Sequence, residues 1–238
     1  MNSLLSSIIS NPEKPFAIIF RPKIDSGIVN LYQCSVDKHT LINEAIKKAQ
    51  SKSEKSLLVL PFRQVKENGY NAIDDEVPVL SLAVEASEKI SFHDFINSIP
   101  DVPVNTKDEK FNLNDQEYGC RVRHLIDHEI EQGAGSNFVL QRKFYATIDE
   151  YEPSKLISLF RNLLNTENSA YWVFLIQTGE QAFIGASPEL HASLNDGELM
   201  MNPISGTYTY PPDGPMDESI LEFSFMSERN RRVIHGCR

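Results

Sequence analysis

The stretch AYWVFLIQTGEQAFIGASPELHASLNDGELMMNPISGTYTY, residues 170–210, contains five short apolar segments in succession. Polar turns at residues 179–180 and 195–197 separate some of these segments. Apolar runs bounded by such turns are typical of consecutive antiparallel strands. The stretch therefore predicts that the second half of the chain contains a sheet.

The segments before this stretch predict further strands and several helices. Residues 16–22 and 27–33 are β-rich runs joined by a turn, which indicates a hairpin, and residues 56–62 are predicted to be a buried strand. We also expect strands at residues 77–85 and 137–148, and a polar loop or linker at residues 100–114. Helices are predicted at residues 40–51, 91–99 and 115–132, and an amphipathic helix is predicted to begin at Pro153. Thr40 is expected to cap the first of these helices, with Glu44 nearby, and Gly133 to end the third. This order predicts an α+β fold with antiparallel β-sheets and helices that cover one side of each sheet.

The composition excludes several classes of protein. The 238 residues include 41% hydrophobic residues, which is too many for a disordered chain, and carry a net charge of −10. This charge argues against nonspecific binding to nucleic acid or to an anionic membrane. We expect no signal peptide and no membrane-spanning segment. Three cysteines without metal or redox spacing indicate a reducing compartment, so the expected location is the cytoplasm.

Histidines and cysteines provide only weak candidate sites. His124 and His128 are four residues apart, but Leu125 stands where a zinc protease of the HExxH type would carry glutamate. The pattern favours two solvated or half-buried helix histidines over a metal site. No partner base marks Cys34 or Cys120 as a nucleophile, and neither a GxGxxG nor a P-loop motif is present.

Two turns carry chemistry that could serve a site. GASPE, residues 185–189, places Glu189 directly after a small-residue turn, and NPISGT, residues 202–207, contains a Gly–Thr pair. Bare glycine backbone lets a ligand approach closely, and a carboxylic acid beside an apolar strand is suited to general-acid chemistry. Taken locally, two well-formed turns without a site remain the alternative.

Together, FIGASPELH and MNPISGTYTYP resemble the chorismate-utilising enzymes, which include anthranilate synthase component I and the aminodeoxychorismate, isochorismate and salicylate synthases. Within this family, three further segments are most similar to the phenazine-biosynthesis branch, the 2-amino-2-deoxyisochorismate synthases. These segments are NFVLQRKF, AYWVFLI and PFRQVKENGY. The resemblance covers residues 16–223. It implies the N-terminal half of an anthranilate synthase component I-like, chorismate-binding fold.

The resemblance also implies roles for particular residues. Glu189 matches the acid that protonates the departing C4 hydroxyl of chorismate, and Gly206 and Thr207 match a turn that contacts the substrate. Asn137 stands where water-using members carry a lysine, and its neutral amide agrees with ammonia as the nucleophile. The implied reaction adds ammonia to C2 of chorismate and gives 2-amino-2-deoxyisochorismate.

The same resemblance implies a cofactor and partners. Members of the family use Mg²⁺, whose glutamate ligands are expected beyond NPISGT, so no metal ligand is assigned in this chain. A glutamine amidotransferase domain or subunit would supply the ammonia, and the full-length enzyme would form a homodimer. No nucleic acid or membrane partner is expected.

The last residues differ from the family pattern. The resemblance implies that residues 1–114 are the N-terminal portion of the chorismate-utilising domain and that residues 115–223 are the first part of its catalytic core. We expect residues 224–238 to be an unrelated tail and the amidotransferase domain to be absent. One legal set of codons for residues 223–238, read one base further on, gives a string similar to the family helix at this place. We therefore expect a one-base frameshift near Phe223 and a truncated, inactive fragment whose strands at residues 170–177 and 204–210 lack partners. The coding DNA tests this expectation.

Three alternatives remain open at this point. The first is anthranilate synthase itself, which makes the same intermediate and then eliminates pyruvate. The second is a noncatalytic binding or scaffold module derived from the enzyme. The third is a metalloprotein built on His124 and His128.

Overall fold

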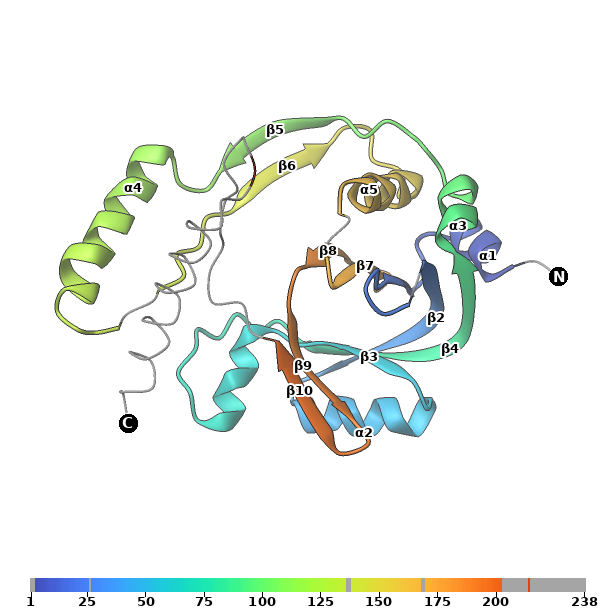
Figure 1. Ribbon diagram of the computed structural model, residues 1–238, viewed down its shortest axis with the longest axis horizontal. Coiled ribbons are helices and arrows are strands. Elements are labelled where there is room, and N and C mark those ends of the chain that lie inside the picture. Colours follow the sequence, from blue (N-terminus) through green and yellow to red (C-terminus); the bar gives the residue numbers. More distant parts are fainter. Residues whose placement is uncertain (1–2, 26, 136–137, 168–169, 203–213, 215–238) are drawn as a thin grey trace.

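A six-stranded antiparallel sheet forms the body of the protein (Figure 1). The computed structural model describes residues 3–25, 27–135, 138–167 and 170–202, and Gly214. In spatial order the strands are β3 (Ser56–Val59), β4 (Val79–Ser91), β2 (Ile28–His39), β1 (Phe16–Phe20), β7 (Trp172–Gln177) and β8 (Ala182–Ser187). β1 and β2 form the predicted hairpin, with Phe16 opposite Gln33. Antiparallel sheets with flanking helices confirm the predicted α+β class.

Helices cover one face of this sheet. Strand alternation directs Phe16 and Ile18 of β1 into a core shared by α1 (Leu4–Ser10), α3 (Phe92–Ser98) and α5 (Pro153–Thr166). Pro153 is at the first turn of α5, as predicted, and Ser91 caps α3 by accepting a hydrogen bond from the Asp94 amide. The members of this core are listed here: Leu5, Ile8, Phe16, Ile18, Phe20, Val29, Leu31, Phe95, Ile99, Leu156, Ile157, Phe160, Leu164, Ala170, Val173 and Leu175. α2 (Ile42–Lys52) lies farther along the same face, where Lys52 pairs with Asp37 of β2 at 2.6 Å.

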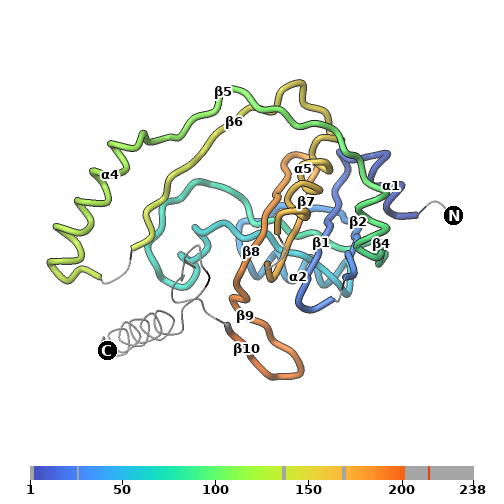
Figure 2. Tube along the Cα trace, turned by 45° about the horizontal axis from the view of Figure 1, so that its top comes forward, coloured from blue at the N-terminus to red at the C-terminus, as the bar shows by residue number. Residues whose placement is uncertain are grey.

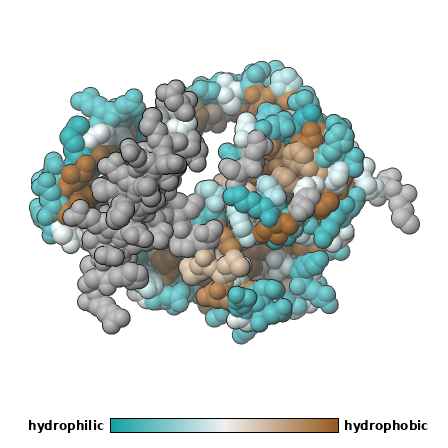
Figure 3. All heavy atoms as spheres, in the orientation of Figure 1, coloured by the Kyte–Doolittle hydropathy of each residue, from teal (hydrophilic) through white to brown (hydrophobic). Residues whose placement is uncertain are grey.

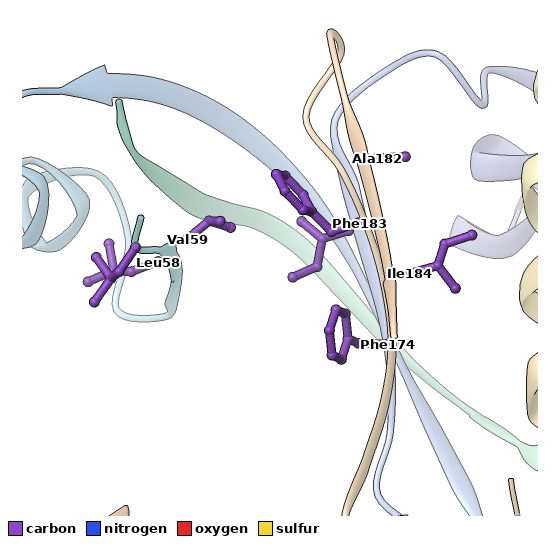
Figure 4. Close-up of a pocket in the computed structure, with 8 residues that line it drawn as sticks. Leu58, Val59, Phe174, Ala182, Phe183 and Ile184 are labelled. Carbon is purple, nitrogen blue, oxygen red and sulfur yellow. The ribbon is translucent and has the colours of Figure 1, made fainter. Parts of the chain in front are cut away.

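The opposite face of the sheet is concave. Cys34, Leu80 and Leu82 form a second buried cluster there, and partly buried residues of both β3 and β8 pack against it. β3 and β8 are the two outer strands of the sheet, so the sheet must curl to bring them to one cluster. Between them is a groove of about 510 Å³, lined by residues that include Leu58, Val59, Phe174 and Phe183. Figure 4 shows Phe174 and Phe183 directed to the same side of the sheet as Val59, with Ile184 directed to the other side.

An arm extends from the body of the protein (Figures 1 and 2). It contains two paired strands, β5 (Thr106–Phe111) and β6 (Phe144–Ile148), called here the β5–β6 hairpin. Between these strands in the chain, at the far end of the arm, are α4 (Asp115–His124) and a π-helical turn, Leu125–Ile130. Asn114 and Glu117 form a reciprocal capping box at the start of α4. Neither helical segment has a buried residue, and apolar side chains gather over α4 at the left of Figure 3. The arm therefore has little core of its own.

Several boundaries differ from those predicted. Residues 100–114 are not only a loop, because they contain β5, and the strand predicted at residues 137–148 is shorter and begins at Phe144. Residues 56–62 form the strand only as far as Val59, and a 3₁₀ helix, Phe62–Asn68, follows. The predicted cap of α2 is wrong. Leu41 is at the N-cap position without a side-chain bond, while Glu67 accepts a hydrogen bond from the Ile42 amide at 3.0 Å.

The prediction that residues 170–177 would lack strand partners is also wrong. β7 pairs with β1 on one side and with β8 on the other, with Leu175 opposite both Ile18 and Ile184. β9 (Leu190–Asn195) and β10 (Glu198–Asn202) then form a hairpin, whose turn at Asp196 and Gly197 has positive φ at both residues. The strand predicted at residues 204–210 and the tail at residues 224–238 lie outside the described residues. None of the described helices is long and apolar enough to cross a membrane.

The two cysteines that the structure describes should differ sharply in reactivity. Cys34 is 3% exposed, and burial raises the pKa of its thiol to about 12, whereas Cys120 is exposed. Because the thiolate is the reactive form, iodoacetamide at pH 8 should alkylate Cys120 in the native protein and leave Cys34 unmodified. Peptide mass spectrometry before and after addition of urea measures both sites. Rapid alkylation of Cys34 without urea would contradict the packing of the second buried cluster.

Candidate active site

Glu189 lies at a corner between two strands. β8 ends at Ser187, Pro188 and Glu189 form the corner, and β9 begins at Leu190. The Ser187 hydroxyl donates a hydrogen bond to the Glu189 carbonyl oxygen at 3.1 Å and accepts one from the Glu189 amide at 3.4 Å. These local bonds fix the backbone of Glu189, and its half-buried position gives its carboxyl group both protein neighbours and access to solvent.

The adjoining end of β7 holds this corner in place. The Tyr171 amide donates to the Ser187 carbonyl at 2.7 Å, and Trp172 is the strand partner of Ser187. The Arg21 guanidinium lies 5.5 Å from the centroid of the Trp172 ring. A bidentate pair with Asp25, at 2.7 and 2.9 Å, raises the pKa of Arg21 and neutralises its charge locally. The Glu189 corner therefore adjoins an aromatic side chain supported by a paired cation.

Gly185 serves a purpose other than the one expected from its motif. A Cβ atom at this position would lie 2.7 Å from Cζ of Phe174 on the neighbouring strand, which is closer than real Cβ contacts. The space that the sequence suggested for an approaching ligand is therefore occupied by the protein's own aromatic ring. Glycine at this position leaves room for the tip of the Phe174 ring against β8, beside the groove.

Replacing Gly185 with alanine should destabilise the protein through this ring. The added methyl must displace Phe174, and overpacking of this kind costs about 1–3 kcal/mol in the free energy of unfolding. Urea unfolding followed by circular dichroism measures the loss. In the double variant Gly185→Ala/Phe174→Ala, the ring that causes the clash is absent. The free energy of unfolding of the double variant should therefore nearly equal that of Phe174→Ala alone. A full additional cost in the double variant would show that the clash with Phe174 is not the cause.

Asn137, Gly206 and Thr207 lie outside the described residues, so their proposed roles stay predictions. Arg142, five residues after Asn137, is among the residues that the structure describes. It donates to the Leu113 carbonyl at 3.0 Å and to Asp115 at 2.6 Å, and it lies 3.9 Å from the Phe111 ring. Arg142 thus joins the start of α4 to the β5–β6 hairpin, a role that sequence spacing did not indicate.

The described residues do not provide a magnesium site. Within these parts of the chain, His, Cys, Asp and Glu side chains form no group of three or more that could hold a metal ion. Glu189 alone does not supply the set of oxygen ligands that Mg²⁺ requires.

The chain matches the family model for chorismate binding enzymes over residues 38–220. It belongs to the chorismate binding enzyme family. The matched residues include β4, β7 and β8 of the main sheet and the Glu189 corner. This family membership is consistent with the resemblance carried by GASPE and NPISGT.

Two relatives in this family cover nearly all of the chain. The phenazine-specific anthranilate synthase of Pseudomonas chlororaphis is 39% identical over 224 residues, which are 92% of this chain and 35% of the relative. The protein of the same name from Pseudomonas fluorescens is 38% identical over 224 residues, again 92% of this chain and 35% of the relative. Anthranilate synthase component 1 of Haloferax volcanii is 29% identical over 50% of this chain and 22% of the relative. The chain therefore spans about a third of the length of its Pseudomonas relatives.

Proposed function

We propose that this chorismate binding enzyme is part of an aminating enzyme that converts chorismate and ammonia to 2-amino-2-deoxyisochorismate in phenazine biosynthesis, in the cytoplasm. The observation that carries the proposal is 39% identity over 92% of the chain to a phenazine-specific relative. Two further relatives, 28–29% identical, are component 1 of anthranilate synthase and match only about half of the chain. The phenazine-specific relatives are therefore the better match, and the identity of the product separates 2-amino-2-deoxyisochorismate synthase from anthranilate synthase.

The proposed chemistry assigns the proton transfer to Glu189. The ammonia nitrogen forms a bond to C2 of chorismate, both ring double bonds shift (C1=C2 to C1=C6 and C5=C6 to C4=C5), and the C4–O bond breaks. The Glu189 carboxyl group protonates the departing hydroxyl, which leaves as water, and the new ammonium group returns a proton to solvent or to the carboxylate. Hydroxide is a poor leaving group, so a positioned acid is needed, and its contribution is on the order of 10²–10⁴-fold.

The remaining roles are proposed on the same basis. Asn137 would present a neutral amide beside the attacking ammonia, which needs no base to become a nucleophile. Gly206 and Thr207 would hold the substrate through backbone amides and a hydroxyl group. Mg²⁺ would bind the substrate carboxylate, with ligands from outside the described residues. A glutamine amidotransferase partner would supply ammonia, and the complete enzyme would form a homodimer.

A chimaera tests the proposed function directly. Residues 16–220 of this chain replace the matching segment of the Pseudomonas chlororaphis relative, and the purified chimaera is given chorismate, glutamine and Mg²⁺. The expected product is 2-amino-2-deoxyisochorismate without pyruvate, as measured by liquid chromatography and mass spectrometry. The unaltered relative is the positive control, and this chain alone, which is expected to form no product, is the negative control.

The other outcomes of this experiment identify the alternatives. Formation of anthranilate together with an equal amount of pyruvate would assign the chain to anthranilate synthase. A folded chimaera that consumes no chorismate would refute both enzymatic assignments and favour a noncatalytic module. Folding is checked by circular dichroism and by size-exclusion chromatography before the assay.

A further inference from the structure

Two exposed imidazole rings face one another at the far end of the arm. His124 is the last residue of α4, and His128 lies in the π-helical turn that follows it. Their ring centroids are 4.6 Å apart, and the ring planes make an angle of 60°. Both side chains are exposed and neither belongs to the Glu189 corner. Their spacing of four residues places the two rings on one side of the helical segment, where α4 passes into the π-helical turn, a type of irregularity that often occurs at functional sites.

The distance between the rings suits two ligands of one metal ion. Zinc binds imidazole nitrogen at about 2.0–2.1 Å, and the ring centroid lies about 1.1 Å beyond that nitrogen. When the angle between the two nitrogen–metal bonds is about 90–110°, the centroids of the two rings are about 4.5–5.2 Å apart. The observed 4.6 Å lies within this range, so the spacing of the two rings agrees with that of two ligands of one ion.

We propose that His124 and His128 form a bidentate surface site for a borderline divalent cation, such as Ni²⁺, Cu²⁺ or Zn²⁺. Imidazole is a preferred ligand of these ions, whereas Mg²⁺ prefers oxygen. Water completes the coordination, because the described residues contain no third His, Cys, Asp or Glu in the group. Cys120, one turn before His124, is not a ligand of this site, and its sulfur accepts a hydrogen bond from Arg123 at 3.3 Å.

The bound ion would act on the arm rather than on the reaction. Neither α4 nor the π-helical turn has a buried residue, so tertiary packing contributes little to their stability. A cation that bridges His124 and His128 binds only when residues 124–128 keep their helical conformation. Binding therefore stabilises this conformation by mass action.

Titration of the untagged full chain with NiCl₂ tests the proposal. Isothermal titration calorimetry should detect one Ni²⁺ site, and His124→Ala or His128→Ala should each raise its dissociation constant at least about tenfold, because one imidazole lacks the advantage of chelation. His93→Ala and His191→Ala, which remove other exposed histidines, and Cys120→Ser should leave the constant unchanged. A large excess of Mg²⁺ should not displace Ni²⁺.

Hydrogen exchange provides the second measurement. Ni²⁺ should slow amide exchange within residues 120–132 of the wild-type chain and not of the His128→Ala variant. Alanine favours the helix, so both alanine variants should keep their fold. Ni²⁺ affinities of His124→Ala and His128→Ala equal to that of the wild type, or a loss caused equally by His191→Ala, would overturn the proposal.

Discussion

Glu189→Gln in the chimaera should lower kcat for 2-amino-2-deoxyisochorismate formation by about 10²–10⁴-fold. Glutamine keeps the shape and the hydrogen-bonding reach of glutamate, but its amide group does not act as an acid toward a leaving hydroxyl. KM for chorismate should change little, because the proposed proton transfer occurs in the transition state rather than on binding. Steady-state rates measured by product chromatography test both expectations.

Glu198→Gln is the matched control for this substitution. Glu198 is an exposed residue at the start of β10, so its replacement removes the same charge from the hairpin that follows the corner without touching the corner itself. We expect the rate of this variant to equal that of the parent chimaera. A Glu189→Gln rate within about threefold of the parent would refute the general-acid role and leave the family assignment intact.

Elements with a strong hydrophobic pattern could be predicted from the sequence. β1 and β2 are apolar runs on either side of a turn, and α5 has apolar residues at helical spacing after Pro153. In both cases the pattern exists because a buried face requires it, as the fully buried Phe16 and Phe160 demonstrate. Burial thus leaves a signal that can be read without coordinates.

Elements held by polar contacts could not be predicted in the same way. β5 has the sequence TKDEKF and is exposed along its whole length, so it shows no alternation of apolar residues. Its partner β6 is also almost fully exposed, although it lies within the longer strand predicted at residues 137–148. The cap of α2 comes from Glu67, 25 positions after Ile42, and such a long-range bond leaves no local pattern.

The site was predictable only in part for a related reason. The strand-to-turn position of Glu189 follows from an apolar run that ends in Ser187 and Pro188. The purpose of Gly185 does not follow from its neighbours in sequence, because the ring that needs the space belongs to Phe174 on another strand. Arg21 and Arg142 were missed because short motifs do not mark the aromatic rings beside them, Trp172 and Phe111, which come from distant parts of the sequence.

Phe160→Ala should cause a large loss of stability in the unmodified chain. Phe160 is fully buried in α5, and its ring makes an edge-to-face contact with Phe95 of α3 at a centroid distance of 6.4 Å. Truncation of such a residue leaves a cavity and costs about 3–5 kcal/mol in the free energy of unfolding. Since domains of this size are stable by only about 5–15 kcal/mol, urea unfolding should shift to a much lower midpoint.

Leu159→Ala separates this packing effect from any effect on the helix itself. Leu159 precedes Phe160 in α5 and is 37% exposed, so its truncation should cost far less although both variants introduce the same alanine. If Phe160→Ala does not fold, Phe160→Leu keeps most of the apolar volume and should show an intermediate loss. Equal urea midpoints for Phe160→Ala and Leu159→Ala would contradict the helix-covered core, because that core depends on α5 presenting Phe160, and not Leu159, to β1 and α3.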